Sequence, residues 1–272
     1  MTSNDRLQRA IEDVVETGFV GVTLHVREGQ HTWSGSAGLA ELGGTDRPPL
    51  DGHVRIGSNT KTFTAALVLQ LVAEGGLGLD DPAADHLPAL GLDGRITVRM
   101  LLQHTSGLFN FTGEVLPDGT LVPGTPAPYG PRARAWVDDR FGRHQPEDLV
   151  RQALANPARF EPGTDWSYSN TNYVLLRLLI EHVTGNPLTE ELRRRILGPL
   201  GLTGTSIPDG SPDLPEPHPH AYYRLDDQAI DITRHDPSWI STGGDMISTT
   251  RDLAVFVSAL LDGRLLPYEL VA

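Results

Sequence analysis

Apolar residues recur at helical spacing along most of the chain and alternate with polar residues mainly near its beginning. Within residues 1–15, one helical face carries Leu7, Ala10, Ile11, Val14 and Val15. Residues 19–26 (FVGVTLHV) favour a strand, and after a tight turn at Glu28-Gly29 residues 30–38 favour a second one. The chain is therefore predicted to begin with an amphipathic helix and a β-hairpin.

The rest of the pattern is mainly helical. A long helix is predicted from about Asn59 to Ala73, ending at Gly75-Gly76. Further helices are expected, in chain order, from Asp80-Asp81-Pro82 with Pro82 in the first turn, from Thr97 to near His104, and over residues 146–156, 172–183, 188–197 and 250–261. The Gly- and Pro-rich stretches 107–145 and 204–240 are expected to be irregular loops.

The predicted strands are too few for a stable sheet. A lone hairpin is marginal in water and leaves open edges. We therefore expect the strands that would pair with it to be missing from this chain or to lie in a partner.

Charge and composition exclude several classes of protein. The net charge of −13 argues against a nucleic-acid partner, because affinity for phosphate backbones depends on Lys and Arg. The absence of cysteine excludes disulfides, thiolate metal sites and Cys nucleophiles. No apolar run approaches the length of a membrane span, and no signal-peptide pattern is visible at the N-terminus. The sequence as written predicts a soluble cytoplasmic protein, or an extracytoplasmic one if a signal peptide has been removed.

The basic residues are distributed unusually. Of the 22, 21 are Arg and the remaining one is Lys61. Arg serves surface and ion-pairing roles but does not readily lose its proton, whereas a desolvated Lys does. A single retained Lys suggests a position that needs a titratable amine, although compositional bias is an alternative explanation.

Lys61 follows Ser58 by three residues at the predicted start of a helix. Residues at this spacing share a helix face, so the amine can reach the hydroxyl. The helix N-terminus also offers free N–H groups where an oxyanion would develop. Burial lowers the pKa of a Lys, which allows it to act as a base in Ser-Lys nucleophilic catalysis. Chance occurrence of the spacing is the alternative.

A second polar cluster, Tyr168-Ser169-Asn170, precedes a predicted helix. A Tyr hydroxyl near a cation can lose its proton below its usual pKa and act as a general base. An Asn amide can hold a Lys or a substrate carbonyl. The alternative is a packing aromatic followed by a helix-capping residue.

Several stretches together resemble the serine β-lactamase and D-alanyl-D-alanine carboxypeptidase superfamily. They are RIGSNTKTFTAALVLQLVAEGGLGLDD (55–81), ITVRMLLQHTSGL (96–108), EPGTDWSYSNTNYVLLRLLIEHVTG (161–185), GLTGTS (201–206) and SWISTGGDMISTTRDLAVF (238–256). The resemblance covers about residues 14–265 in order, with a secreted Streptomyces-type carboxypeptidase, class C β-lactamases and β-lactamase-like esterases as relatives. It implies a β-lactamase/transpeptidase-like α/β fold of the α+β type, with an antiparallel sheet flanked by helices and a mostly helical subdomain.

The resemblance also implies a division of the chain. Residues 1–57 would form the helix and hairpin of the α/β part. Residues 58–240 would form the mostly helical part that carries both motifs. Residues 241–272 would form the helix that leads back toward C-terminal strands.

Residue roles follow from the same resemblance. Ser58 is expected to be acylated, with its N–H forming half of an oxyanion hole, and Lys61 and Tyr168 are expected to share the proton transfers. Asn170 is expected to position Lys61 and the substrate amide, and Trp239 to line the substrate pocket. The turn from His104 to Gly107 is expected to be structural, so His104 is not assigned to catalysis.

The chain departs from the family at one motif. A Lys/His-Thr/Ser-Gly triplet, expected on a strand after the last helix, does not occur after Tyr168. In the family this strand offers the second oxyanion N–H and binds the substrate carboxylate. We therefore expect the C-terminal strands to be missing from this chain, and the chain alone to be poorly stable and weakly active, because losing one oxyanion donor can cost about 10²–10³ in rate.

Three substrates remain open for a serine hydrolase: a D-Ala-D-Ala peptide, a β-lactam or a small ester or amide. The carboxypeptidase-like activity is the first expectation, and β-lactamase or esterase/amidase activity the alternative. A non-catalytic relative that binds a peptide or a partner is the rival from another class. No cofactor is expected, and no metal, because His218 and His220 lie in a Pro-rich loop without ligand spacing. The three aspartates Asp80, Asp81 and Asp245 are expected to cap helices or turns. The sequence gives no indication of an oligomeric state.

Overall fold

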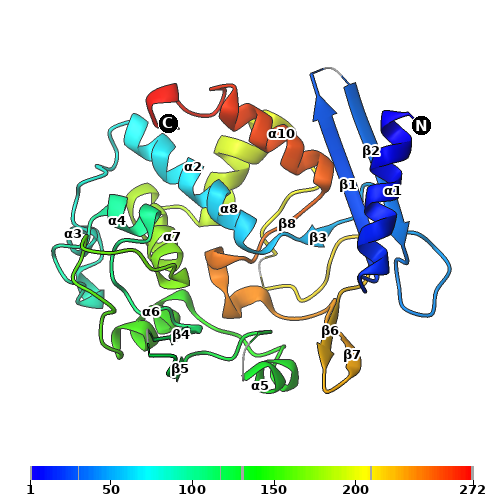
Figure 1. The fold of residues 1–272 in the computed structure, drawn as a ribbon. Coiled ribbons are helices and arrows are strands. Elements are labelled where there is room, and N and C mark those ends of the chain that lie inside the picture. Colours follow the sequence, from blue (N-terminus) through cyan, green and yellow to red (C-terminus); the bar gives the residue numbers. More distant parts are fainter. Residues whose placement is uncertain (1, 30, 117, 130–131, 209, 271–272) are drawn as a thin grey trace.

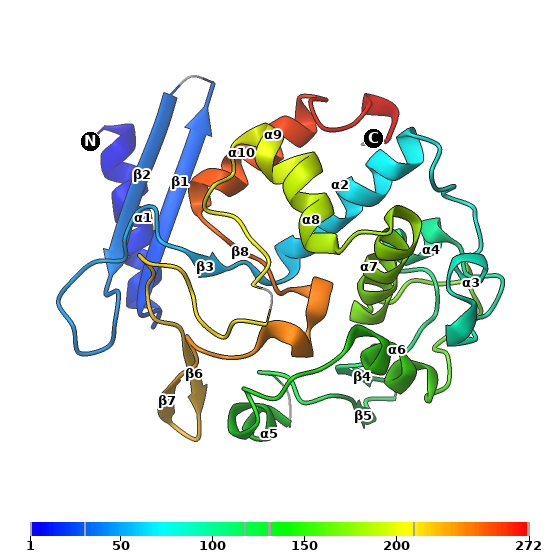
Figure 2. The same cartoon turned by 180° about the vertical axis from the view of Figure 1, so that it is seen from behind.

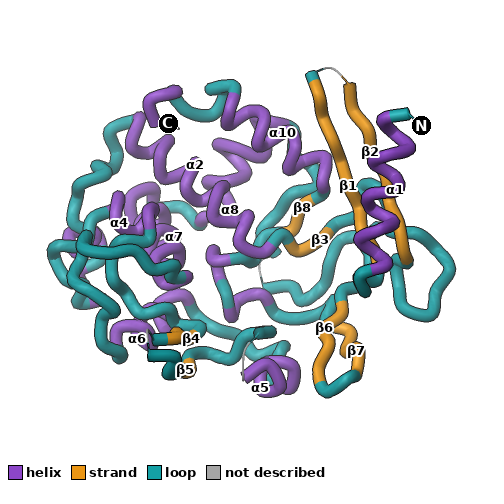
Figure 3. Tube along the Cα trace, in the orientation of Figure 1, coloured by secondary structure: helices purple, strands orange, loops and turns teal. Residues whose placement is uncertain are grey.

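The computed structural model describes residues 2–29, 31–116, 118–129, 132–208 and 210–270. In these ranges helices dominate, long loops connect them, and the strands form antiparallel pairs (Figure 3). This is the α+β composition expected from the sequence.

The N-terminal elements form as predicted. Helix α1 (Ser3–Glu16) begins with a capping box in which Thr2 and Asp5 each accept a hydrogen bond from the other's backbone N–H. Strands β1 (Gly21–Glu28) and β2 (His31–Gly38) pair in register from Gly21 with Gly38 to Glu28 with His31. Helix α1 packs on this hairpin, to one side of the helical part of the molecule (Figures 1 and 2).

The centre of the helical part is built from α2 (Thr60–Ala73) and α7 (Asn170–Thr184), which pack against each other. Most residues of both helices are buried, so the apolar surface surrounds each helix instead of forming a single stripe. Phe63 of α2 stacks on Phe256 of α10 (Thr250–Leu261), with ring centroids 3.7 Å apart. Helix α10 also contacts β1 and thereby links the core to the hairpin.

A short long-range pairing positions the later part of the chain beside α2. Strand β3 (Val54–Arg55) pairs with β8 (Ile247–Ser248), and the N–H of Ile56 donates to the carbonyl of Met246 at 3.0 Å. This pairing brings the segment before β8 next to the start of α2. It was not predicted, because two-residue strands carry no periodicity.

The remaining elements are short. They are α3 (Ala83–His86), α4 (Val98–Gln103), β4 (Gly113–Val115), β5 (Leu121–Pro123), α5 (Ala133–Asp138), α6 (Pro146–Leu154), α8 (Leu188–Leu192), a π-helical turn (Arg193–Leu197), α9 (Gly198–Leu200), β6 (Tyr222–Leu225) and β7 (Gln228–Asp231). In the described ranges β4 pairs only with β5, and β6 only with β7.

The sequence-based prediction was wrong in detail at several places. Residues 107–145 contain the β4–β5 hairpin and α5, and residues 204–240 contain the β6–β7 hairpin. The turn of that second hairpin uses Asp226 and Asp227 at positive φ, a conformation that Asp tolerates but that no Gly signals here. Helix α7 begins at Asn170, two residues earlier than expected, and Pro82 precedes α3 instead of occupying its first turn.

Candidate active site

Ser58 lies in a 3₁₀ turn (Gly57–Asn59) that leads directly into α2, and Lys61 lies in the first turn of that helix. Gly57 has φ +53°, and a side chain on Gly244 would meet its backbone, so two glycines allow the chain segments to approach here. Lys61 is only 6% exposed, and its Nζ is 3.3 Å from Ser58 Oγ. The predicted contact between amine and hydroxyl is present.

The cluster at the start of α7 also contacts Ser58 and Lys61. The Tyr168 hydroxyl is 2.8 Å from Ser58 Oγ. The Asn170 Oδ1 accepts a hydrogen bond from Lys61 Nζ at 2.8 Å, and Asn170 Nδ2 donates to Thr112 Oγ1 at 3.4 Å. The structure thus brings together the four residues that the two motifs single out.

A backbone carbonyl completes the surroundings of Lys61. Gly243, in a 3₁₀ turn (Ser241–Gly243), accepts hydrogen bonds from Lys61 Nζ at 2.5 Å and from Ser58 Oγ at 3.3 Å. Sequence reasoning missed this contact because any residue type offers a carbonyl. Its only signal was the position of Gly243 within a stretch that resembles the family.

Burial controls the proton affinity of Lys61. Desolvation lowers the pKa of its amine to about 7, while the negative charge of Asp245 acts in the opposite direction. The rings of Tyr168 and Tyr173 lie 4.8 and 5.4 Å from Nζ and favour the charged form. A substantial fraction of the amine is therefore neutral near pH 7, as the sequence-based reasoning required.

The pKa of the Tyr168 hydroxyl was expected to be lowered, and it is raised instead. Burial raises the pKa of its hydroxyl above the usual value, and the hydrogen bond with Ser58 offsets only part of that effect. The nearby Tyr129 also acts to raise the pKa of Tyr168. Tyr168 is therefore protonated at neutral pH, and Lys61 is the group with the depressed pKa.

His104 supports the site from behind. It ends α4 in a left-handed conformation, and its Nδ1 lies 3.2 Å from the backbone N–H of Ser169 and 3.1 Å from Asn172 Nδ2. Burial, with the charge of Lys61 as a second cause, lowers the pKa of His104 to about 4. A neutral His104 accepting both hydrogen bonds fixes the backbone beside Tyr168, consistent with a structural role.

Trp239 is not among the residues gathered at Ser58. It is 8% exposed and packs edge-on against Trp136, with ring centroids 5.8 Å apart. A pocket of about 10 Å³ that it lines includes Trp136 and Asp236 but not Ser58. The structure therefore gives Trp239 a packing position beside Trp136, and the expectation that it lines a substrate pocket stays a prediction.

The three aspartates differ from one another. Asp81 closes a turn by accepting from the N–H of Gly78, and Asp80 forms an ion pair with Arg99. Asp245 was expected to cap a helix or turn, but it is 4% exposed and its Oδ1 has no hydrogen-bond partner among the described residues. Burial raises the pKa of Asp245 to about 6.

The described ranges hold no group of three or more His, Asp or Glu side chains placed to bind a metal ion. His220 Nδ1 instead lies 2.7 Å from an Asp231 carboxylate oxygen. None of the helices in those ranges has the length and apolar character needed to cross a bilayer.

Fold and site together define the class of protein. Residues 7–272 match the model of the Beta-lactamase family, and the chain belongs to that family. The resemblance stated from the motifs, and the β-lactamase/transpeptidase-like fold that it implied, are confirmed.

Within this family, the chain is similar to several individual proteins. A D-stereospecific amidohydrolase from a Streptomyces species is 38% identical, with a TM-score of 0.86 over 99% of this chain and 76% of that one. A D-amino acid amidase from Ochrobactrum anthropi, solved with L-phenylalanine, is 29% identical, with a TM-score of 0.83 over 98% of this chain and 74% of that one. The putative penicillin-binding protein PbpX of Bacillus subtilis is 27% identical over 264 residues, which are 96% of this chain and 60% of PbpX.

Proposed function

We propose that this chain carries the acylating machinery of a serine hydrolase that cleaves amides with a D-amino acid residue on the acyl side. The observation that carries the proposal is the contact of Ser58 Oγ with both the Tyr168 hydroxyl and the amine of Lys61, whose pKa is lowered to about 7. Such an arrangement activates a hydroxyl without a histidine.

The hydrogen bonds of Lys61 support its role as the base. A neutral amine has two N–H groups, which match Asn170 Oδ1 and the Gly243 carbonyl. Its lone pair is then left for the Ser58 hydroxyl. Lys61 takes the proton as Ser58 Oγ attacks the substrate carbonyl carbon, and the oxyanion forms beside the start of α2.

Tyr168 is suited to relay the proton onward. Its hydroxyl contacts Ser58 Oγ and stays protonated at neutral pH, so it can give a proton to the leaving amine and receive the one held by Lys61. The amide bond breaks as the acyl-enzyme forms on Ser58. Water then attacks the ester, which releases the acid and restores the Ser58 hydroxyl.

The relatives support the substrate class. Two of them are named for D-stereospecific or D-amino acid amide hydrolysis, and a third is named as a penicillin-binding protein. The carboxypeptidase activity that the sequence suggested belongs to the same class, because a D-Ala-D-Ala peptide is cut after a D-alanine. β-Lactam or ester hydrolysis by the same acyl-enzyme is the alternative.

Mass spectrometry after incubation with benzylpenicillin tests the nucleophile. We expect one adduct on the wild-type chain, none on Ser58→Ala, and an unchanged adduct on the exposed control Ser3→Ala. Hydrolysis of D-phenylalaninamide, its L-enantiomer, a D-Ala-D-Ala peptide, nitrocefin and p-nitrophenyl acetate then orders the substrates. No adduct and no turnover of any of the five by a folded chain would point to the non-catalytic binding relative.

A further inference from the structure

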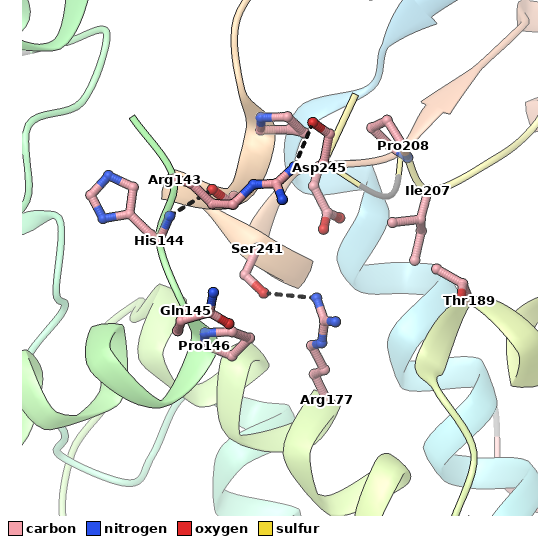
Figure 4. A pocket seen from close by; sticks show the side chains of 13 residues that line it. Arg143, His144, Gln145, Pro146, Arg177, Thr189, Ile207, Pro208, Ser241 and Asp245 are labelled. Carbon is pink, nitrogen blue, oxygen red and sulfur yellow. Dashed lines mark hydrogen bonds between the residues drawn. The ribbon is translucent and has the colours of Figure 1, made fainter. Parts of the chain in front are cut away.

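A second cavity lies beside the segment that carries Gly243. Its volume is about 160 Å³, and it is lined by residues from the start of α6, from α7 and α8, and from the segments that connect the helices (Figure 4). Ser241 and Asp245 line it, while the carbonyl of Gly243 between them accepts from Lys61. The cavity and the Ser58 site therefore share one chain segment, but Ser58 and Tyr168 do not line the cavity.

Two opposite charges face each other in this cavity. Figure 4 shows the Asp245 carboxylate and the Arg177 guanidinium pointing toward one another from opposite walls. The two form no ion pair within 4.0 Å. Asp245 is 4% exposed, and its Oδ1 has no hydrogen-bond partner in the described part of the chain. Oδ1 itself is enclosed, so a bound donor would meet the carboxylate on the side that faces the cavity in Figure 4.

On the positive side of the cavity, one guanidinium nitrogen has no hydrogen-bond partner among the described residues. Arg177 Nε pairs with Glu181 at 3.1 Å and Nη1 donates weakly to Ser241 Oγ at 3.4 Å, but Nη2 has no partner in the described residues. Arg143 lines the same cavity with an exposed guanidinium, which donates to the carbonyl of Gly210 at 3.0 Å and pairs with the buried Asp236 at 3.4 Å. The lining thus holds two cations and one carboxylate.

We propose that this cavity binds a small free α-amino acid, with the ammonium group on Asp245 and the carboxylate on Arg177 and Arg143. An anion without an amine would face the Asp245 carboxylate, and a cation without a carboxylate would face two guanidiniums. A dipolar amino acid satisfies both walls with charge-assisted hydrogen bonds. A cavity of about 150 Å³ accommodates a molecule of benzene size, so the volume suits a side chain as small as that of alanine.

The site is separate from the acylation site, so its occupancy does not depend on the proposed reaction. Isothermal titration of the wild-type chain with D-alanine and with L-alanine tests it directly. We expect saturable binding of at least one enantiomer that Ser58→Ala leaves unchanged. Acetate or methylammonium alone is expected to bind roughly tenfold more weakly or worse, because each keeps only one of the two charge-assisted contacts.

Variants of the lining locate the bound molecule. Asp245→Asn and Arg177→Gln are each expected to weaken binding by roughly tenfold or more, because each removes one charged partner. Arg143→Gln supplies a lining variant at an exposed position, although it also removes the ion pair with Asp236, and the exposed Arg193→Gln serves as the unaffected control. Thermal melts establish that each variant is folded.

Three results would overturn the proposal. They are the absence of saturable binding, loss of binding in Ser58→Ala, and unchanged affinity in the folded lining variants. Equal binding of acetate would also contradict it, because it would show an anion site in which Asp245 has no part.

Discussion

Lys61 has three hydrogen-bond acceptors within reach, and its protonation state decides how it meets them. As an ammonium it can donate to Asn170 Oδ1, to the Gly243 carbonyl and to Ser58 Oγ. As a neutral amine it keeps the first two and turns its lone pair to Ser58. The lowered pKa therefore couples the state of one buried amine to the reactivity of one hydroxyl.

The pH dependence of kcat/KM tests this coupling. Because the neutral amine is the reactive form, kcat/KM is expected to rise with pH through about 7 and to level off above it. His104 is already neutral there and Tyr168 is still protonated, so neither produces the rise. Rates measured between pH 5 and 9 on N-acetyl-D-phenylalaninamide, which has no titrating amine of its own, provide the profile.

Asp245→Asn supplies the control for that assignment. The negative charge of Asp245 raises the pKa of Lys61, so its removal is expected to move the rise to lower pH. The variant also removes the carboxyl that itself titrates near pH 6. A rise that stays in place in this variant would show that Lys61 is not the group observed.

Tyr168→Phe tests the proton relay. The change removes one half-buried hydroxyl whose hydrogen-bond partner is Ser58. We expect kcat to fall by about 10²–10⁴, the range for loss of a general acid or base, with little change in the melting temperature. Tyr268→Phe, at a residue 71% exposed, is the matched control. Retention of full activity by Tyr168→Phe would transfer the relay to water or to Lys61 alone.

At the scale of residues, the sequence predicted what side-chain chemistry can reveal. Ser58 and Lys61 were found through their spacing and the single Lys, and Tyr168 and Asn170 through their motif and the family resemblance. Gly243 acts through its carbonyl, which leaves no side-chain signal. The packing of Trp239 against Trp136 could not be read from the sequence, and its place in a substrate pocket stays a prediction.

The first turn of α7 is held by a buried polar network. Ser106 Oγ donates to Asn172 Oδ1 at 2.6 Å, and Asn172 Nδ2 meets His104 Nδ1 at 3.1 Å. Asn172 is fully buried, two residues after the Asn170 that holds Lys61. The network therefore fixes the helix end that carries part of the site.

Asn172→Ala is expected to destabilise the fold by about 1–3 kcal/mol, because Ser106 and His104 lose a buried partner. Activity of the folded fraction is expected to fall as well, since Asn170 loses support. Urea unfolding and kcat at matched folded fraction separate the two effects. The exposed Asn4→Ala in α1 is expected to change stability by less than about 0.5 kcal/mol. An equally small effect of Asn172→Ala would mean that water replaces the amide.

At the scale of elements, long helices were predicted from the sequence and very short strands were not. The helices α2, α7 and α10 were anticipated because each spans at least three turns and is rich in apolar residues. The β3–β8 pair was not predicted because its strands are two residues long and nearly two hundred positions apart in the chain. That pair nevertheless sets Gly243 beside Lys61, so the least predictable element positions part of the site.

The whole molecule consists of a hairpin with its helix on one side and a helical body on the other (Figure 1). Among the described residues β1 pairs with β2 alone, so the expectation that further strands complete this sheet stays a prediction. The chain spans 60% of PbpX and 76% of the Streptomyces amidohydrolase. The activities of those longer proteins are therefore proposals for this chain.

Because the sequence has a single lysine, chemical labelling of amines can measure global unfolding of this chain. Lys61 carries the only side-chain amine in the sequence, and it is 6% exposed beneath Ser58 and Tyr168. A bulky, charged amine-reactive ester is therefore expected to label the native chain only at its α-amino group. Unfolding in urea exposes Lys61 and adds a second label, whose amount follows the unfolded fraction. Lys61→Arg removes the second label under all conditions, which assigns it by mass. Rapid double labelling without denaturant would show that the environment of Lys61 opens locally, and the buried amine proposed as the base would then lose its physical basis.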